Sequence, residues 1–304
     1  WKNSYTLWTD TVEKSPDSSM THNNMGNAYY KKGEIDKATD HYQIAVKLAP
    51  DYVGPHYNLA LIYSKEGRLE DAINESMIAI KLKPDYPETY NNLGNVYYNL
   101  GRFNEAIKEY MISLRFKPDY AEAHNNLGNA YAIQGRLEDA INEYMTAIKL
   151  KPDYPEAHNS LGNIYANLGR FNEALNEYMI ALRFKPDYAE AHNNLGNVYA
   201  VQGKLGEAIK EYLIVLRLTP EDAETHNNLA NAYSETGELN KAIEHYQIAL
   251  RLIPDYHDAH YNLGLVYLKK GLRHKAEEEF KTALKLRPDF TRAREALESI
   301  NRER

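Results

Sequence analysis

Apolar residues recur along this chain at the three- and four-residue spacing of a helix, and short polar breaks separate one helical pattern from the next. From Ala121 onward, one helical face carries Leu127 and Tyr131, and the following face carries Ala140 and Tyr144. Gly and Pro stand in the breaks between the patterns. We therefore expect pairs of amphipathic helices joined by tight turns.

The pair of patterns returns every 34 residues, eight times, between Ser19 and Phe290, without an insertion or deletion. We number the positions of each repeat from 1 to 34 and name its two helices A and B. Position 15 is always Gly, which suits a helix end with positive φ, and position 32 is always Pro, which cannot continue a helix. The copies begin at Ser19, Val53, Pro87, Ala121, Pro155, Ala189, Ala223 and His257. A constant short period predicts an all-α solenoid, one elongated domain in which each repeat touches only its neighbours.

Small residues occupy two positions where helices A and B are expected to meet. Position 20 is Ala in every copy, and position 8 is Gly except at Ala60 and Ala230. A side chain of one carbon or none lets two helices approach closely. The pattern therefore predicts tight packing within each repeat.

The string AEAHNNLGNAYAIQGRLEDAINEYMTAIKLKPDY, which begins at Ala121, resembles the tetratricopeptide repeat. The residues at that family's signature positions are Leu127, Gly128, Tyr131, Ala140, Tyr144, Ala147 and Pro152. The resemblance covers nearly the whole chain and implies a right-handed superhelix of helix-turn-helix repeats, with helix A lining the concave side. Position 4, usually Trp in the family, departs from the pattern and is occupied by His22, His56, Tyr90, His124, His158, His192, His226 and His260.

The two ends of the chain differ from the repeats. Residues 1–18 match the second half of a repeat, and we expect them to form helix B of a truncated repeat whose apolar surface supports weak self-association. The same stretch resembles the join between a membrane-embedded mannosyltransferase-like region and its tetratricopeptide tail, through Trp1, Leu7, Trp8, Asp10, Thr11, Val12, Ser15 and Pro16. Residues 291–304 are expected to form a C-terminal capping helix with Ala293, Ala296, Leu297 and Ile300 turned inward.

Composition excludes several classes of function. The chain has 304 residues, no Cys and a formal net charge of −7, so disulfides, thiolate catalysis and Cys-based zinc sites are excluded. No stretch has the length of a membrane span and no signal-peptide pattern is present, so we expect no direct membrane insertion of this segment. Lys and Arg gather near the ends of helix B, where they suit the helix dipole, and a nucleic-acid partner is not expected. The compartment stays open between the cytoplasm and the periplasm or a lumen.

Amide side chains dominate one face of helix A. Positions 2, 5, 6, 9, 12 and 13 share this face by helical spacing, and Asn recurs at positions 6 and 9, with Leu61 and Leu265 as interruptions at position 9. Ile133 and Val201 add apolar patches at position 13. The candidate binding residues are Asn24, Asn58, Asn92, Asn126, Asn129, Asn163, Asn194, Asn197, Asn228, Asn231 and Asn262, together with Ile133 and Val201.

Two interpretations of these amides stay open. Asn is a poor residue inside a helix, so its repeated use asks for a reason. One reason is a ladder that pairs with the peptide groups of an extended ligand, as implied by a resemblance to the tetratricopeptide region of the O-linked N-acetylglucosamine transferase. The other is hydrogen bonding between neighbouring repeats. The Glu at position 2 either forms an acidic margin that favours Lys or Arg on a ligand, or complements the helix dipole.

No catalytic constellation is visible. The His residues at position 4 lie on helices about 8 to 10 Å apart, too far to share a metal ion. We expect no metal site, no cofactor and no enzymatic activity. The chain is predicted to be a protein-protein interaction scaffold that binds an extended peptide or protein segment. The alternatives are a substrate-presenting arm of a larger membrane-bound or O-linked glycosyltransferase, and a purely structural spacer.

Overall fold

The computed structural model describes residue 8 and residues 15–302. This part of the chain contains helices and no strand, as the sequence predicts. The A helices are α2 (Ser19–Lys31), α4 (Val53–Lys65), α6 (Pro87–Asn99), α8 (Ala121–Ile133), α10 (Pro155–Asn167), α12 (Ala189–Val201), α14 (Ala223–Glu235) and α16 (His257–Lys269). The B helices are α3 (Ile35–Leu48), α5 (Leu69–Leu82), α7 (Phe103–Phe116), α9 (Leu137–Leu150), α11 (Phe171–Phe184), α13 (Leu205–Leu218), α15 (Leu239–Leu252) and α17 (Arg273–Leu286). The last helix is α18 (Thr291–Arg302).

The invariant Gly and Pro end the helices as expected. Every Gly at position 15 has positive φ, between 71° and 83°. After Gly135, the N–H of Arg136 donates to the carbonyl of Tyr131 across 3.0 Å, which closes the end of α8 in the manner of a Schellman motif. Helix α9 ends where the N–H of Lys151 donates to Ala147, because Pro152 follows and has no N–H to give.

In the repeats with Gly at position 8, the ring at position 24 lies in the space that a side chain on this Gly would fill, whereas the seventh repeat combines Ala230 with Tyr246. A Cβ on Gly128 would lie 2.7 Å from Cε1 of Tyr144, closer than two such carbons approach. The Ala at position 20 is fully buried in every repeat. In the second repeat, Ala60 takes the place of Gly and Ser76 takes the place of the large ring. The sequence prediction of tight packing is confirmed, with a buried aromatic ring as the group that needs the space.

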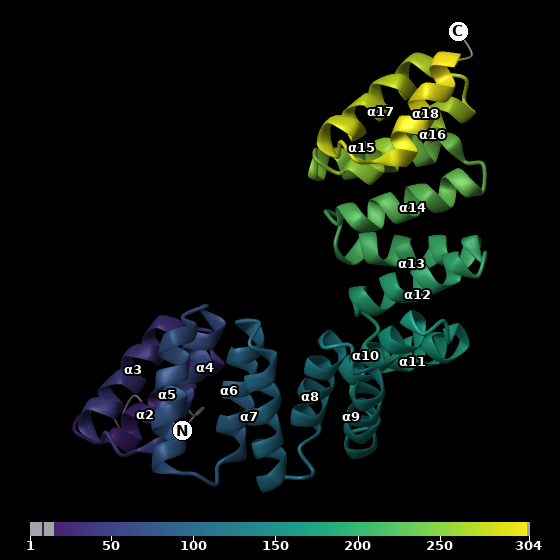
Figure 1. Ribbon diagram of the computed structural model, residues 1–304. Coiled ribbons are helices and arrows are strands. Elements are labelled where there is room, and N and C mark those ends of the chain that lie inside the picture. Colours follow the sequence, from purple (N-terminus) through teal and green to yellow (C-terminus); the bar gives the residue numbers. More distant parts are fainter. Residues whose placement is uncertain (1–7, 9–14, 303–304) are drawn as a thin grey trace. The chain divides into compact units, whose positions relative to one another are not determined.

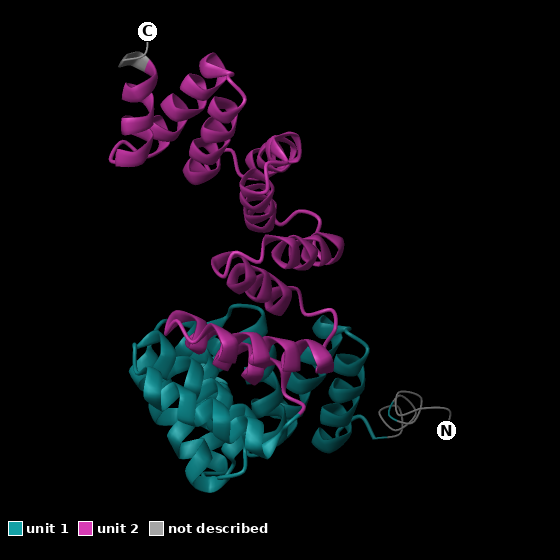
Figure 2. Cartoon of the chain, turned by 90° about the vertical axis from the view of Figure 1, so that its right-hand side faces the viewer, with its two compact units in different colours: residues 1–152 teal, residues 153–304 magenta. Residues whose placement is uncertain are grey.

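The chain divides into two compact units, residues 1–152 and residues 153–304, and the boundary falls in the last residues of the fourth repeat (Figure 2). Within each unit, every B helix packs against its own A helix, and a B helix that is followed by an A helix of the same unit packs against that helix as well (Figure 1). In the second unit, α18 packs against α17 and buries Ala293 and Ile300. None of the helices described is both long and apolar enough to cross a membrane.

The predicted truncated repeat in residues 1–18 lies largely outside the described residues. The self-association expected of it and the mannosyltransferase-like motif carried by it therefore stay predictions.

Candidate functional site

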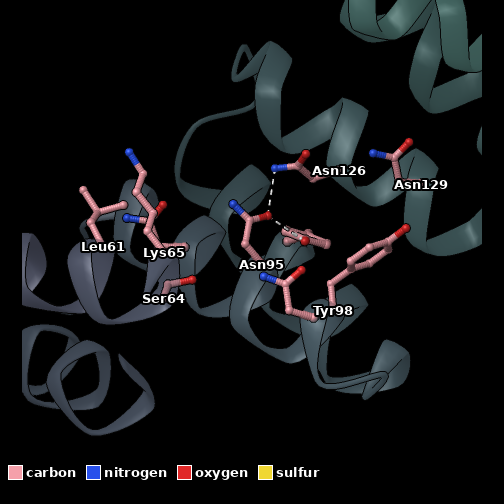
Figure 3. Close-up of a pocket in the computed structure, with 10 residues that line it drawn as sticks. Leu61, Ser64, Lys65, Asn95, Tyr98, Asn126 and Asn129 are labelled. Carbon is pink, nitrogen blue, oxygen red and sulfur yellow. Dashed lines mark hydrogen bonds between the residues drawn. The ribbon is translucent and has the colours of Figure 1, made fainter. Parts of the chain in front are cut away.

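The face predicted from the spacing of helix A lines real hollows in both units. In the first unit, a hollow of about 360 Å³ is lined by residues at positions 6, 9, 12 and 13 of successive A helices, among them Asn92, Asn126 and Asn129 (Figure 3). In the second unit, hollows of about 430 and 450 Å³ are lined by Asn163, Asn194, Asn197, Val201, Asn228 and Asn231. These candidate residues share a face within their own unit, as predicted.

The remaining candidates are placed by their own contacts. Asn58 and Asn262 belong to the hydrogen-bond network described next. Ile133 is 51% exposed at the end of α8, and Asn24 is half-buried on α2.

A tyrosine from helix B holds each position-9 amide. The hydroxyl of Tyr144 donates to Oδ1 of Asn129 across 2.8 Å. The same bond joins the Tyr at position 24 to the Asn at position 9 in five other repeats: Tyr42 to Asn27, Tyr110 to Asn95, Tyr178 to Asn163, Tyr212 to Asn197 and Tyr246 to Asn231. These tyrosines are buried, so the bond satisfies a hydroxyl that would otherwise be costly to bury.

An asparagine from the following repeat donates to the same oxygen. Nδ2 of Asn126 lies 3.0 Å from Oδ1 of Asn95, where Tyr110 also donates (Figure 3). Its second N–H donates to Oδ1 of Asn91, and Asn58 and Asn194 make the same pair of bonds to the repeats before them. An amide oxygen has two lone pairs, so the oxygen of Asn95 is fully used, whereas that of Asn129 accepts from Tyr144 alone within the described chain, because position 6 of the next repeat is Ser160. The interpretation of the amides as links between repeats is thus borne out by these contacts.

The network also fixes what the face can offer to a ligand. Because its oxygen accepts from the Tyr hydroxyl, the position-9 amide turns its Nδ2 away from this Tyr. In Asn95 and Asn129, Nδ2 has no acceptor within the described chain. The position-6 amides are oriented in the opposite sense, since Asn126 and Asn194 use their Nδ2 and leave Oδ1 available. Each such repeat therefore presents one donor group and one acceptor group to the hollow.

The two interruptions at position 9 have a common cause. Leu61 belongs to the repeat whose position 24 is Ser76, and Leu265 belongs to the repeat whose position 24 is Phe280. Neither Ser76 nor Phe280 carries a phenolic hydroxyl, so an amide oxygen at position 9 would have no Tyr hydroxyl to accept from. Position 5 changes with them, from Asn to Tyr57 in one case and to Tyr261 in the other. Positions 5, 9 and 24 therefore change together in these two repeats.

Leu61 leaves a buried amide of the next repeat without a hydrogen-bond acceptor. Asn92 occupies position 6 there, but its usual acceptors are replaced by Tyr57 and Leu61. Its Nδ2 is buried without an acceptor in hydrogen-bonding geometry. Leu61, Asn92 and Lys65 line the hollow of the first unit side by side, and Lys65 lies over the ring of Tyr30.

Most of the Glu residues at position 2 are already partnered. Glu88 pairs with Lys117 at 3.1 Å, and Glu156 pairs with Lys185 at 3.5 Å. In the repeats between and after them, Glu122 accepts from Asn91 and Glu190 accepts from Asn159. Only a minority of these carboxylates are therefore available for a ligand.

The histidines at position 4 are structural groups with two hydrogen bonds each. Nε2 of His56 lies 2.9 Å from the carbonyl of Pro50, and Nδ1 lies 2.5 Å from Glu75. The carbonyl can only accept, so Nε2 carries a proton, and the bond to Glu75 raises the pKa of His56. The same arrangement raises the pKa of His192 through Glu211.

Three repeats depart from this pairing of His with Glu. His22 faces His41 and His226 faces His245, with the two Nδ1 atoms 2.9 Å apart in both cases. Burial lowers the pKa of His41 and His245, and the neighbouring imidazole lowers it further. In the third repeat Tyr90 donates to the carbonyl of Pro84 in place of Nε2.

The histidines form no metal centre in the described residues, where no group of three or more His, Asp and Glu side chains is placed to hold an ion. The sequence predicted that these histidines share no metal ion, but it did not predict their hydrogen-bond partners. The signal was present at position 23, which is Glu or His in every repeat.

Comparisons with known proteins agree with the geometry. A family profile described as "TPR repeat" matches residues 26–67, 62–101, 95–135, 128–169, 162–203, 196–237 and 231–271. A second, described as "Tetratricopeptide repeat", matches residues 257–290. No curated protein sequence matches the chain.

Solved structures show the same fold at low identity. The chain is similar to the APC/C hetero-tetramer Cut9-Hcn1, with a TM-score of 0.69 and 19% identity over 96% of this chain and 57% of that one. It is similar to PilF of Pseudomonas aeruginosa, with a TM-score of 0.64 and 19% identity over 70% and 97% of the two chains. It is also similar to YrrB, "a TPR protein with an unusual peptide-binding site", with a TM-score of 0.54 and 24% identity over 62% and 96%. The chain thus spans a little over half the length of the first of these relatives.

Proposed function

We propose that this chain, which belongs to the tetratricopeptide repeat family, is a non-catalytic protein-interaction scaffold that binds an extended segment of a partner along the amide face of helix A. The observation that carries the proposal is the fixed orientation of the amides. Position 9 offers N–H donors, and position 6 offers carbonyl acceptors, in hollows of about 360 to 450 Å³.

An extended peptide suits this arrangement. Its backbone exposes N–H and C=O groups at short, regular intervals, and these groups are the same for every sequence. The oriented amides can pair with them without reading side chains. YrrB, described as having a peptide-binding site, has the same fold at 24% identity, a level that supports only the fold.

The finer likenesses raised by the sequence remain proposals. Matched profiles and structures are tetratricopeptide proteins in general, and none of those reported is a mannosyltransferase-like protein or the O-linked N-acetylglucosamine transferase. A role as the substrate-presenting arm of a glycosyltransferase would use the same amide face.

The structure suggests a substitution that separates binding from folding. Asn129→Asp and Asn197→Asp keep the oxygen that accepts from Tyr144 and Tyr212 but remove the N–H donors that face the hollows. The probe is a library of fluorescent decapeptides, blocked at both ends and random in sequence. We expect the full chain to retain peptide, and the double variant to retain it about tenfold less, which corresponds to about 1.4 kcal/mol.

A matched control uses the same change of residue away from this face. Asn74 and Asn142 are exposed on the B helices, and Asn74→Asp with Asn142→Asp adds the same charge. This control should bind peptide as the unchanged chain does. Equal retention by all three proteins would contradict a role for the amide face, and no retention by the unchanged chain would contradict peptide binding itself.

A further inference from the structure

We propose that the sixth and seventh repeats form a subsite for a basic side chain, Lys or Arg, of the bound peptide. This inference rests on the proposed function and adds the chemistry that one part of the face selects. It is carried by the hollow of about 450 Å³ in the second unit, which is lined by Val201, Glu224 and Glu235 among other residues.

Glu224 has no Lys partner of the kind that pairs with the position-2 Glu of the third and fifth repeats. In the third and fifth repeats, the Glu at position 2 pairs with a Lys at position 31, as in Glu88 with Lys117. In the seventh repeat, position 31 is Ile253, which is 47% exposed and cannot pair with a carboxylate. Glu224 is exposed and makes no ion pair within the described part of the chain.

Glu235 brings a second carboxylate to the same hollow. It is the one acidic residue at position 13, where the other repeats carry Lys, Asn, Ile or Val. Both carboxylates act on one group: burial raises the pKa of Tyr212, and Glu224 and Glu235 raise it further. Lys269, at position 13 of the next repeat, donates to the carbonyl and the hydroxyl of Ser234.

The rest of the hollow suits the stem of a long basic side chain. Val201 is 68% exposed, and Ala200 and Leu205 lie beside it in the lining. Lys and Arg bury their aliphatic stems on such surfaces and keep their charge at the edge. A charged head between two carboxylates gains charge-assisted hydrogen bonds. Asn228 and Asn231 stand in the same hollow for the peptide backbone.

The hollow of the first unit provides an internal contrast. It is built from the same positions of helix A, but Lys65 lines it and no carboxylate does. The acidic character therefore belongs to the sixth and seventh repeats and does not follow from the fold.

The test uses the full chain and four pools of blocked, fluorescent decapeptides. One central position is fixed as Lys, Arg, Ala or Glu, and the other positions are random. We expect the Lys and Arg pools to bind about tenfold more tightly than the Ala pool, a difference of about 1.4 kcal/mol. Glu224→Gln with Glu235→Gln should reduce them to the level of the Ala pool. Circular dichroism establishes that each variant is folded.

Glu88→Gln with Glu156→Gln is the matched control, because it removes the same charge from carboxylates that already have Lys partners. This control should keep the preference for Lys and Arg. The inference is overturned if the unchanged chain binds all pools alike, if the Glu224 and Glu235 variant keeps the preference, or if the control loses it equally. Retention of no pool by the unchanged chain would instead overturn the proposed function, and this inference with it.

Discussion

At the scale of single residues, the repeated Asn has two separate uses within one side chain. The oxygen at position 9 receives the hydroxyl of a buried Tyr and, in most repeats, an amide of the following repeat. The nitrogen of the same amide faces the hollow. The two interpretations of the amides therefore do not exclude each other, because they concern opposite ends of the group.

The hydrogen bond between Tyr144 and Asn129 can be tested by introducing the Phe and Leu that occupy the same two positions in the last repeat. Tyr144→Phe or Asn129→Leu alone should destabilise the fold by about 1 kcal/mol, because the first leaves the half-buried oxygen of Asn129 without its donor and the second leaves the buried hydroxyl of Tyr144 without its acceptor. The two changes together reproduce the pair Leu265 and Phe280 of the last repeat, and should cost less than the sum of the single changes. Urea denaturation of the four proteins measures this. Strict additivity would show that the bond contributes nothing beyond the separate side chains.

Histidine pairs give two kinds of repeat with opposite responses to pH. The folded pKa of His56 is raised, so its contribution is present below the ordinary value of 6.5 and is lost as pH rises through the raised value. The folded pKa of His245 is lowered, so stability is lost as pH falls from 6.5 through the lowered value. The first kind favours mild acid and the second favours neutral or basic solution.

His41→Glu with His245→Glu should convert the second kind into the first. Each new carboxylate would face His22 or His226 as Glu211 faces His192. We expect the urea midpoint to rise at pH 5.5, where the native pair must protonate against burial, and to change little at pH 8. An equal shift at both pH values would show that the imidazole pairs do not titrate as inferred.

At the scale of the helices, sequence was sufficient because each boundary depends on one residue. Gly at position 15 and Pro at position 32 set the ends of helices A and B, and all eight Gly residues have the expected positive φ. Hydrogen bonding of the amides between repeats was one interpretation of the sequence, but the Tyr and the particular Asn partners were not predicted from it. These partners lie 15 and 31 residues apart on different helices, and only the joint change at Leu61, Ser76 and Tyr57 reveals them.

Two glycines near one turn distinguish the effect of backbone conformation from that of helix propensity. Gly203 has φ of 71° and follows the end of α12, whereas Gly206 is the second residue of α13 and has open space around it. Gly203→Ala should destabilise the fold by about 1 to 2 kcal/mol, the cost of a Cβ in the left-handed region. Gly206→Ala should stabilise it by roughly 0.5 kcal/mol through helix propensity. Thermal melting of both variants checks the pair, and a loss of stability in both would contradict the separation.

At the scale of the whole molecule, the sequence predicted one elongated domain, and the structure divides into two compact units at residue 152. Both follow from the same property. A repeat that contacts only its neighbours has no long-range contacts to bind distant parts together, so a boundary can fall at any junction between repeats. The right-handed sense of the coil implied by the family resemblance stays a prediction.

This property predicts that damage stays local. Tyr110 is buried in α7, and Tyr110→Ala leaves a large cavity that should cost about 4 kcal/mol. In a nearest-neighbour stack the loss falls on the altered repeat and decays over adjacent repeats. We therefore expect hydrogen exchange to accelerate in α6 and α7, less in α5 and α8, and to stay unchanged from α12 to α17. The reciprocal change Tyr246→Ala should spare α2 to α7. If either substitution raised exchange evenly along the chain, the two units would unfold as one cooperative body, and the nearest-neighbour account of stability would fail.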